Sequence, residues 1–235
     1  MSASVVSLLL ADARTPSGGY AHSGSLEPAV AAGLRTAEVR AFISARLASV
    51  AYVDAAFAAA ACSDPREVAG LWDQRLHGDL AALDAELAAR TPCEPQRLAL
   101  RALGRGLLRI GRRLWPADER LAAYAGASAW TPRPVAFGLL ASAGGLTPAE
   151  AARLSLYEDA AGVAAAAVKL LPLDAAETTA WLASLAGEIE ALAVAAAEAA
   201  ARAAGSPADL PATATPALDL LALTHHESEG KLFVS

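Results

Sequence analysis

The segment TPSGGYAHSGSLE, residues 15–27, combines side chains capable of chemistry with residues that bend the backbone. Histidine, serine and glutamate occur in nucleophilic and acid–base sites, and paired glycines are typical of phosphate-binding loops. We call residues 15–27 the opening segment; its candidate site residues are Pro16, Gly18, Gly19, Tyr20, His22, Ser23 and Glu27. Three interpretations are open: a phosphate cradle, a catalytic site, or a turn that leads into a helix.

The spacing argues against the first two interpretations. Gly18 and Gly19 are not followed by Gly-Lys-Ser/Thr and no strand is predicted before them, so a phosphate loop is not indicated. His22 and Ser23 are adjacent, and adjacent residues cannot place a serine oxygen against the imidazole as a catalytic triad requires. A tight turn and a helix cap are the structural alternative, because glycine adopts backbone angles that other residues avoid.

A second group consists of arginines spaced four residues apart in a predicted helix. This arginine ridge contains Arg97, Arg101, Arg105, Arg109, Arg112 and Arg113. Such a ridge could hold RNA or an acidic protein surface. The alternative is a solvated face, paired partly with acidic residues of the preceding helix, namely Asp73, Asp79, Asp84 and Glu86. No aromatic residue is interleaved to stack on bases, which favours the solvated face and leaves an RNA- or nucleoprotein-binding module as a rival function.

A third group, near the end of the chain, contains residue types that bind transition metals. His225 and His226 are followed by Glu227 and Glu229. Neighbouring helical residues point about 100° apart, so the two histidines cannot share one ion without distortion. A helical metalloenzyme that brings His22 and His225 together is a second rival function. We therefore predict no cofactor and no stable metal site of the chain's own, and leave a weak or shared metal site at a subunit interface as the alternative.

The elements that must position these residues are predicted to be helical throughout. Hydrophobic residues make up 55% of the 235 residues, many of them alanine, and only 5% of the chain is aromatic. Alanine has the highest helix propensity, and the alternating pattern of strands is missing. We therefore expect an all-α fold: one domain over residues 1–235, an alanine-rich bundle of about ten helices.

Caps and helix breakers divide the chain. Helices are predicted over residues 5–11, from Ser23, from Thr36 as one long helix past Phe57, from Pro65 to about 90, and over 94–114. The helix after the WTPRP break ends at Gly144 and Gly145. Later helices begin at a Thr147–Glu150 capping box and at Asp174. A proline-rich connection, residues 206–216, precedes a final amphipathic helix and the tail KLFVS, residues 231–235.

Charge and cysteine usage restrict the class of protein. The net charge of −6 argues against a nucleic-acid partner. The N-terminus lacks a basic leader and carries Asp12, and the longest uncharged stretch, residues 134–149, is broken by prolines and glycines, so we expect neither secretion nor a membrane span. Cys62 and Cys93 fit reduced thiols. The expected location is the cytoplasm.

The opening segment resembles the signature of the urease accessory protein family UreF, roughly Pro-x-Gly-Gly-Phe-x-Tyr-Ser-x-Gly-Leu-Glu. The matching residues are Pro16, Gly18, Gly19, Ser23, Leu26 and Glu27. Tyr20 and His22 keep ring character, whereas Ser25 stands where the family has glycine. A central pattern is similar at Arg97, Gly104 and the Leu107–Leu108 pair, with Leu100 in place of serine, and PRPVAFGLLASAGG resembles a later family segment.

The C-terminal end carries the second resemblance. The family pattern runs Pro-x-Leu-Asp, a histidine, and Arg-Leu-Phe close to the end of the chain. The corresponding residues here are Pro216, Leu218, Asp219, His225, Lys231, Leu232 and Phe233. Lysine at 231 keeps the charge of arginine and loses its planar, bidentate fork. The segment AAVKLLPLDAAE departs from a family region that ends in Leu-Gly-Gln.

This resemblance covers nearly the whole chain and implies a non-enzymatic maturation chaperone. Such a protein forms a homodimer, binds a UreD-type partner (UreH in some organisms), recruits the GTPase UreG and helps deliver nickel to apo-urease. The implied partner-binding or nickel-transfer surface comprises the opening segment together with His225, Lys231, Leu232 and Phe233. We further expect the tail to be mobile in the free chain, with Leu232 and Phe233 as exposed apolar anchors for the partner.

Overall fold

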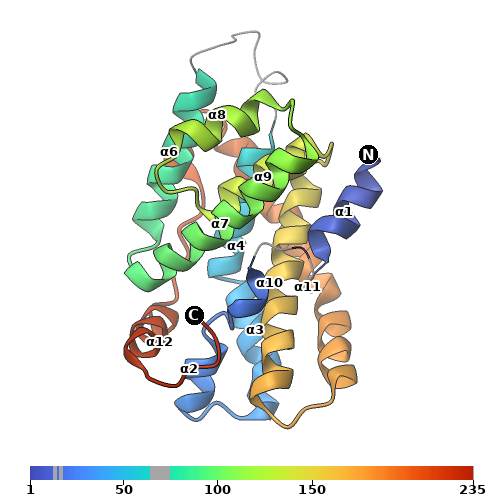
Figure 1. Ribbon diagram of the computed structural model, residues 1–235. Coiled ribbons are helices and arrows are strands. Elements are labelled where there is room, and N and C mark those ends of the chain that lie inside the picture. The colour runs from blue at the N-terminus through green and yellow to red at the C-terminus, as the bar shows by residue number, and fades with distance from the viewer. Residues whose placement is uncertain (13–14, 16–17, 64–74, 235) are drawn as a thin grey trace.

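The computed structural model describes residues 1–12, 15, 18–63 and 75–234, which form α-helices and short 3-10 turns and no β-strand (Figure 1). The all-α prediction of about ten helices is confirmed. The helices are α1 (Ala3–Ala11), α2 (Leu26–Ala31), α3 (Val39–Leu47), α4 (Val50–Cys62), α6 (Arg75–Arg90), α7 (Glu94–Leu114), α8 (Glu119–Ala127), α9 (Arg133–Ala143), α10 (Pro148–Leu170), α11 (Ala175–Arg202) and α12 (Pro216–Glu227). The 3-10 turns are η1 (Gly19–Ala21), η2 (Thr36–Glu38) and η3 (Pro207–Asp209).

Helix α4 lies at the centre, packed against α9, α10 and α11. Its alanines are buried nearly all round, which fits a helix enclosed by neighbours rather than one with a single apolar face. Small side chains also let backbones approach closely. A Cβ added at Gly138 of α9 would lie 2.2 Å from the carbonyl oxygen of Ala58 in α4, so only glycine fits this crossing.

The predicted caps on the two longest helices are confirmed. The Thr147 hydroxyl accepts the Glu150 backbone N–H at 3.3 Å, while the Glu150 carboxylate accepts the Thr147 N–H at 2.8 Å. Asp174 accepts the N–H of Ala176 at 2.9 Å. Such caps satisfy N–H groups that have no partner inside the helix. They fix where α10 and α11 begin, and these two helices then pack along each other.

The single long helix predicted from Thr36 is wrong in two respects. The chain breaks between α3 and α4 at Ser49, whose hydroxyl donates to the Ala45 carbonyl at 2.7 Å and whose backbone leaves the helical region. At the start, Glu38 accepts the backbone N–H of Arg35 at 2.9 Å and also binds its guanidinium, so Arg35, not Thr36, occupies the capping position. The predicted helix start at Pro65 lies outside the described residues.

Helix α8 was not predicted; Asp118 caps it by accepting the N–H of Leu121 at 2.9 Å. The predicted partners of the arginine ridge on α7 are engaged elsewhere. Asp84 accepts hydrogen bonds from the hydroxyls of Tyr124 and Ser128, and Glu86 pairs with Arg90. The side chains of Asp73 and Asp79 lie outside the described residues. The rest of the ridge, Arg101, Arg105, Arg109, Arg112 and Arg113, is exposed as predicted, without those ion pairs to Asp84 and Glu86. Arg97 is the exception, because it is half-buried and donates to the carbonyl oxygens of Thr91 and Pro92 at 2.7 and 2.6 Å.

Two helical stretches in the described part of the chain are long and apolar enough to cross a membrane by length and composition alone. Residues 36–62 span η2, α3 and α4, and 56% of their most apolar window is buried in the core. The second stretch is α11, of whose window only 22% is buried. Both stretches carry charged side chains, so neither is an uncharged run of the kind sought in the sequence. The core helix of a soluble protein passes the same test.

Candidate functional site

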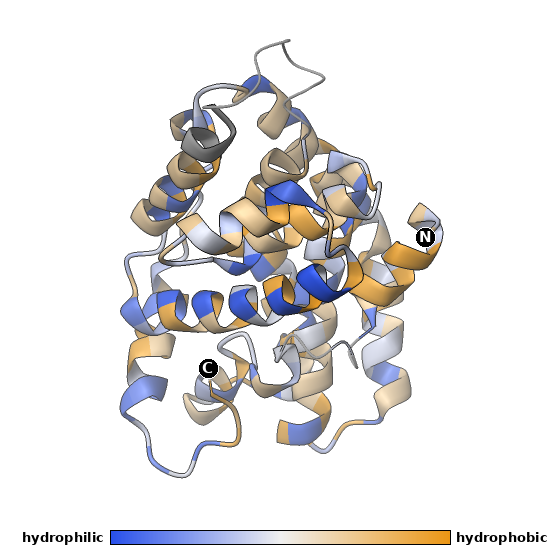
Figure 2. Ribbon diagram, turned by 45° about the horizontal axis from the view of Figure 1, so that its top comes forward, coloured by the Kyte–Doolittle hydropathy of each residue, from blue (hydrophilic) through white to orange (hydrophobic). Residues whose placement is uncertain are grey.

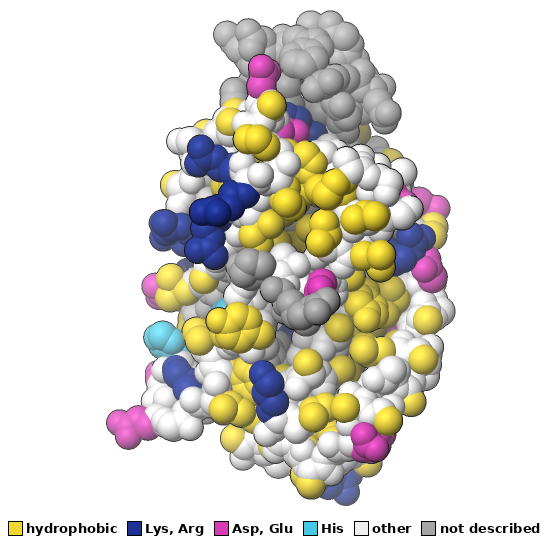
Figure 3. Space-filling model, turned by 45° about the vertical axis from the view of Figure 1, so that its right-hand side comes forward, with side chains coloured by type: hydrophobic (Ala, Val, Ile, Leu, Met, Phe, Trp, Pro, Cys, Tyr) yellow, Lys and Arg dark blue, Asp and Glu magenta, His cyan; other side chains and the backbone are white. Residues whose placement is uncertain are grey.

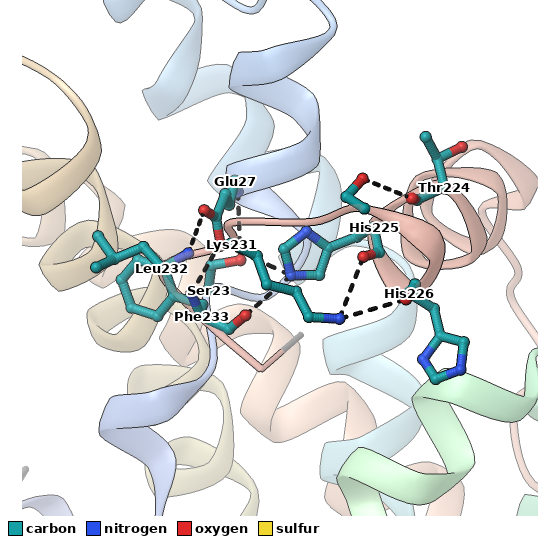
Figure 4. Close-up of polar contacts among 9 residues, drawn as sticks. Ser23, Glu27, Thr224, His225, His226, Lys231, Leu232 and Phe233 are labelled. Atoms are coloured by element: carbon teal, nitrogen blue, oxygen red, sulfur yellow. Dashed lines mark hydrogen bonds and ion pairs between the residues drawn. The ribbon is translucent and has the colours of Figure 1, made fainter.

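The carboxylate of Glu27, in the first turn of α2, holds the C-terminal tail against the opening segment (Figure 4). Its Oε1 accepts the backbone N–H of Leu232 at 2.7 Å, and its Oε2 accepts that of Phe233 at 2.9 Å. Both carboxylate oxygens are thus used on successive amides. Hydrogen bonds of this kind, with an ionised acceptor, are stronger than neutral ones. The two ends that carry the family resemblance meet at this one side chain.

His225, in the last turn of α12, completes this arrangement, which we call the tail clamp: Glu27, His225, Lys231, Leu232 and Phe233 (Figure 4). Its Nε2 lies 3.1 Å from the Phe233 carbonyl oxygen and 3.7 Å from Glu27 Oε2. Because a carbonyl only accepts, Nε2 carries the proton in this hydrogen bond. His225 is buried, and its contacts with Phe233 and Glu27 place it inside the clamp.

Lys231 caps the carboxyl end of α12. Its Nζ donates to the carbonyl oxygens of His225 and His226 at 3.4 and 3.3 Å. A cation at this position compensates carbonyls that have no partner within the helix and the negative end of its dipole. Because the contacts are single bonds to carbonyl oxygens, the ammonium group suffices here. The departure from arginine therefore leaves this cap in place.

The opening segment is a turn followed by the start of α2, whose N-cap position is Ser25 and not the predicted Ser23. Gly18 has φ +98°, a conformation that favours glycine, and it precedes η1. Ser23 is fully buried, and its hydroxyl accepts the backbone N–H of Glu27 at 3.2 Å. Ser25 has φ +65°, so the serine occupies a left-handed conformation where the family signature has glycine. Gly19 is described by the structure and its φ is not positive. Gly18 is therefore the member of this pair at which the turn requires glycine.

The tail is docked, contrary to the expectation of a mobile segment with two apolar anchors. Phe233 is only 4% exposed and belongs to the core, with the Lys169 ammonium 5.2 Å from its ring centroid. The Val234 N–H donates to the Ala21 carbonyl at 2.7 Å, which ties the tail to η1. Leu232 remains 62% exposed. Main-chain hydrogen bonds to two elements thus fix the tail, and only one of the two predicted anchors faces solvent.

The connection before α12 is also held. The guanidinium of Arg90, at the end of α6, donates to the carbonyl oxygens of Ala208, Leu210 and Pro211 at 2.8–3.0 Å. Leu210 is buried. Residues 206–216 therefore connect α11 to α12 as predicted, but they contain the turn η3 and are fastened to α6 rather than forming a free linker.

Behind the opening segment lies a cavity of about 450 Å³, the central cavity. The opening segment, α3, α4, α7, α9, α10 and the tail all contribute to its wall. Its polar lining includes His22, Arg46, Asp54, Arg90, Arg133, Glu158, Asp159 and Lys169. The arrangement places the imidazole of His22 among carboxylates and guanidinium groups from distant parts of the sequence.

Two ion pairs cross this cavity wall. Arg46 of α3 binds Asp159 of α10 through both its Nε and its Nη2, at 3.1 and 2.5 Å. Arg133, the first residue of α9, binds Glu158 at 2.6 Å. All four side chains are largely withdrawn from solvent. Charges in such surroundings persist only when paired, because desolvation penalises an isolated charge heavily.

The same burial shifts the protonation of the remaining groups. Burial raises the pKa of Asp54 to about 7, because loss of hydration outweighs the attraction of Arg133 and Arg46. Burial also raises the pKa of Glu158. Burial, together with the positive charge of Arg133, lowers the pKa of His22. Near neutral pH the cavity therefore holds a neutral imidazole at His22 and a carboxyl group at Asp54 that is only partly ionised.

A sequence model of the UreF family matches residues 34–186, more than half of the chain. The chain belongs to the UreF family. A urease accessory protein UreF from Mycobacterium sp. (strain JLS) is 38% identical over 236 residues, covering 97% of both chains. The UreF proteins of Mycolicibacterium vanbaalenii (strain DSM 7251) and Mycobacterium tuberculosis (strain H37Rv) are 38% and 36% identical, with both chains covered in full.

In this UreF-family chain, the fold joins some of the predicted site residues and separates others. Glu27, His225, Lys231, Leu232 and Phe233 form the tail clamp, with Ser23 capping beneath it. His22 instead lines the central cavity, whose lining does not include His225, so the two histidines do not form one site. His226 is exposed. Pro16 lies outside the described residues.

Sequence reasoning missed the charges of the central cavity. Arg46 and Asp159 are 113 residues apart, and no local spacing connects them. Asp54 did carry a signal, as the lone acid within the apolar run AYVDAAFAAAA, and Arg133 carried another, between two prolines. No three His, Cys, Asp or Glu side chains in the described part of this UreF-family chain form a group that could hold a metal ion.

Proposed function

We propose that this chain is a non-enzymatic maturation factor of the cytoplasm that, with a UreD-type (UreH-type) partner, recruits the GTPase UreG and helps deliver nickel to apo-urease. One observation carries the proposal beyond family membership. The two segments that resemble the UreF family at either end of the chain converge on Glu27 and form one ordered surface. Convergence of this kind is expected of a binding surface, because it positions exposed side chains on a rigid backbone.

The surface around the clamp supports docking of a protein partner. Tyr20, Leu232 and Val234 are 71%, 62% and 64% exposed, although the backbone on either side of them is held by hydrogen bonds. Val234 lies beside η1, which contains Tyr20, because its N–H binds the carbonyl of Ala21. Exposed apolar side chains on an ordered backbone lose little conformational entropy when a partner covers them. We assign the UreD-type partner to this surface.

We place the path of nickel, as cargo, through the central cavity. Imidazole and carboxylate groups are ligands that suit Ni²⁺, and His22, Asp54, Glu158 and Asp159 line this space. Arg46 and Arg133 already engage two of the carboxylates. A metal ion would have to compete with these guanidinium groups, so binding would be weak. Weak binding suits passage of an ion to a partner better than its storage.

A homodimer is the proposed assembly. Only 22% of the most apolar window of α11 is buried, and Val194 on this helix is half-exposed. Figure 3, which turns the right-hand side of Figure 1 forward, shows hydrophobic side chains spread over that face of the molecule. A second copy would cover such surface. Light scattering that finds only monomer across a wide range of concentrations contradicts this assembly.

The partner assignment is tested by pull-down with the UreD homologue of the same organism and by urease activation in cells lacking the chromosomal copy. Leu232→Glu should reduce both readouts by about tenfold or more, since it places a charge in an apolar contact. Leu220→Glu, at a comparably exposed leucine of α12, is the matched control. Equal capture of both variants would mean that the partner binds another face.

The nickel path is tested with His22→Ala and Glu158→Gln. Both variants should still capture the UreD homologue, because neither residue belongs to the tail clamp. Each should lower the nickel content of urease matured in cells, as measured by metal analysis of the purified enzyme. Full nickel loading by both variants would remove the central cavity from the path while leaving the docking assignment intact.

A further inference from the structure

A second hollow lies between α6, α7 and the end of α8 and has a volume of about 510 Å³. We call it the α6–α7 groove. It shares no lining residue with the central cavity. Its apolar lining consists of Leu80, Ala81, Ala85, Ala88, Leu98, Tyr124, Ala127, Ala129 and Trp130. Nothing in the proposed maturation role uses this groove.

The two long walls present their side chains at helical spacing. Helix α6 contributes Ala81, Ala85 and Ala88, and α7 contributes Glu94, Leu98 and Arg101. Leu98 is half-exposed at 50%, although it is a large apolar side chain. Two helix faces with a shallow apolar space between them accept a third helix, whose side chains fill that space as ridges fill grooves.

The polar groups at the floor of the groove are already satisfied. The carboxylate of Asp84 accepts the hydroxyls of Tyr124 and Ser128 at 2.7 and 2.6 Å. The indole N–H of Trp130 donates to the carbonyl of Arg97 at 3.2 Å. A ligand entering here would therefore meet apolar surface rather than vacant donors and acceptors. The part of the ligand that enters must itself be apolar.

The α7 rim of the groove is strongly basic. Arg101 lines the groove, and Arg105, Arg112 and Arg113 continue along the same helix, all of them exposed. None of these four arginines makes an ion pair with the residues that the structure describes. Figure 2 shows hydrophilic residues at regular intervals along the long helix that crosses the front of the molecule. This local positive charge is conspicuous in a chain whose net charge is −6.

We propose that the α6–α7 groove is a docking site for an acidic amphipathic helix of a partner protein. Apolar side chains of that helix, three or four residues apart, enter the groove against Leu98 and Trp130. Its Asp and Glu residues, on the flank toward α7, face Arg101 and Arg105. An apolar groove beside a basic rim is complementary to that pattern in both shape and charge. The inference does not depend on the role in urease maturation.

RNA fits the same surface less well. Phosphate groups would find partners on the ridge, but bases would meet a groove whose single indole is half-buried and already hydrogen-bonded. Binding of single strands relies on successive exposed aromatic rings, which α7 lacks. The shape and the apolarity of the groove therefore favour a helix over a nucleic acid as its ligand.

The probe for the test is a fluorescein-labelled synthetic helical peptide with leucines at i, i+4 and i+7 and glutamates on one flank. Fluorescence anisotropy measures its binding to the full-length chain, and NMR follows the indole N–H of Trp130. Leu98→Glu should weaken binding about tenfold, as should the double change Arg101→Glu with Arg105→Glu. Arg202→Glu, at an exposed arginine on α11, is the matched control and should bind like the unaltered chain.

All substituted side chains are exposed, so thermal unfolding should be unchanged, which excludes misfolding as the cause. A peptide with lysines in place of the glutamates should bind at least about tenfold more weakly. Three outcomes overturn the proposal: no binding of the acidic peptide, binding that Leu98→Glu leaves unchanged, or tighter binding of poly(U) RNA that depends on the arginines and not on Leu98. The last outcome would identify the ridge as a nucleic-acid surface.

Discussion

Glu27 and Phe233 lie 206 residues apart in the sequence, and the carboxylate of the first accepts the backbone N–H of the second at 2.9 Å. The ring of Phe233 is also buried in the core, so the hydrogen bond and the packing hold the same residue. The tail is therefore attached both by a charge-assisted hydrogen bond and by apolar packing. Removing either should loosen the other.

We expect Glu27→Ala to release the tail. The change leaves the N–H groups of Leu232 and Phe233 without acceptors, which should lower the free energy of unfolding by about 1–3 kcal/mol. Hydrogen exchange at these two amides should become much faster. Glu229→Ala, at an exposed carboxylate near the tail, is the control. Unchanged protection of the two amides in Glu27→Ala would show that packing of Phe233 alone holds the tail.

The turn of the opening segment should distinguish its two adjacent glycines. Gly18 has φ +98°, so Gly18→Val should lower the free energy of unfolding by about 1–3 kcal/mol and displace the residues that follow. Gly19 lies in η1 without a positive φ, so Gly19→Val should cost less. Urea unfolding of the two variants measures the difference. A larger loss at Gly19 would contradict this account of the turn.

Stability should depend on pH through Asp54. Burial raises its pKa to about 7 in the folded chain, above its value in the unfolded chain, so the folded state binds more protons between these values. The contribution of Asp54 to stability is therefore greatest at low pH and is lost as pH rises through about 7. Asp54→Asn, which cannot ionise, should gain about 1–3 kcal/mol at pH 8 relative to the unaltered chain and much less at pH 4.

The measurement is urea unfolding of both chains from pH 4 to pH 8. Comparison of the two curves separates the contribution of Asp54 to stability from that of His22. Burial and Arg133 lower the pKa of His22, so its contribution to stability rises with pH, in the opposite direction to that of Asp54. Glu158, with its raised pKa, acts in the same direction as Asp54 and is present in both chains. Parallel curves for the two chains would mean that Asp54 stays ionised in the folded state.

Gly138→Ala should disrupt the crossing of α9 and α4. The added Cβ would lie 2.2 Å from the backbone oxygen of Ala58, and backbone cannot move aside as a flexible side chain can. We expect a loss of about 1–3 kcal/mol or more in the free energy of unfolding. Gly162→Ala in α10 is the control, because no atom outside its own stretch of helix backbone lies within 4 Å of its added Cβ. The control should gain up to about 1 kcal/mol, since alanine favours the helix.

Local features explain why much of the fold could be predicted. The boundaries of α10 and α11 follow from Thr147, Glu150 and Asp174, whose side chains bond to amides two or three residues away. Neighbours in sequence determine such contacts, so they can be read without tertiary structure. The same rules failed at Ser49, where a side-chain hydrogen bond to the preceding helix turn accompanies a break within an otherwise continuous apolar pattern.

The sequence by itself determined the all-α class, most helix boundaries and the family, because propensity, caps and short motifs act over a few residues. Only the tertiary structure decided that Phe233 is buried, that His22 and His225 belong to different sites, and that Arg46 meets Asp159. These facts depend on which helix faces become neighbours. Packing of the whole chain selects those faces, and an alanine-rich sequence with similar apolarity around its helices leaves the choice open until the core forms.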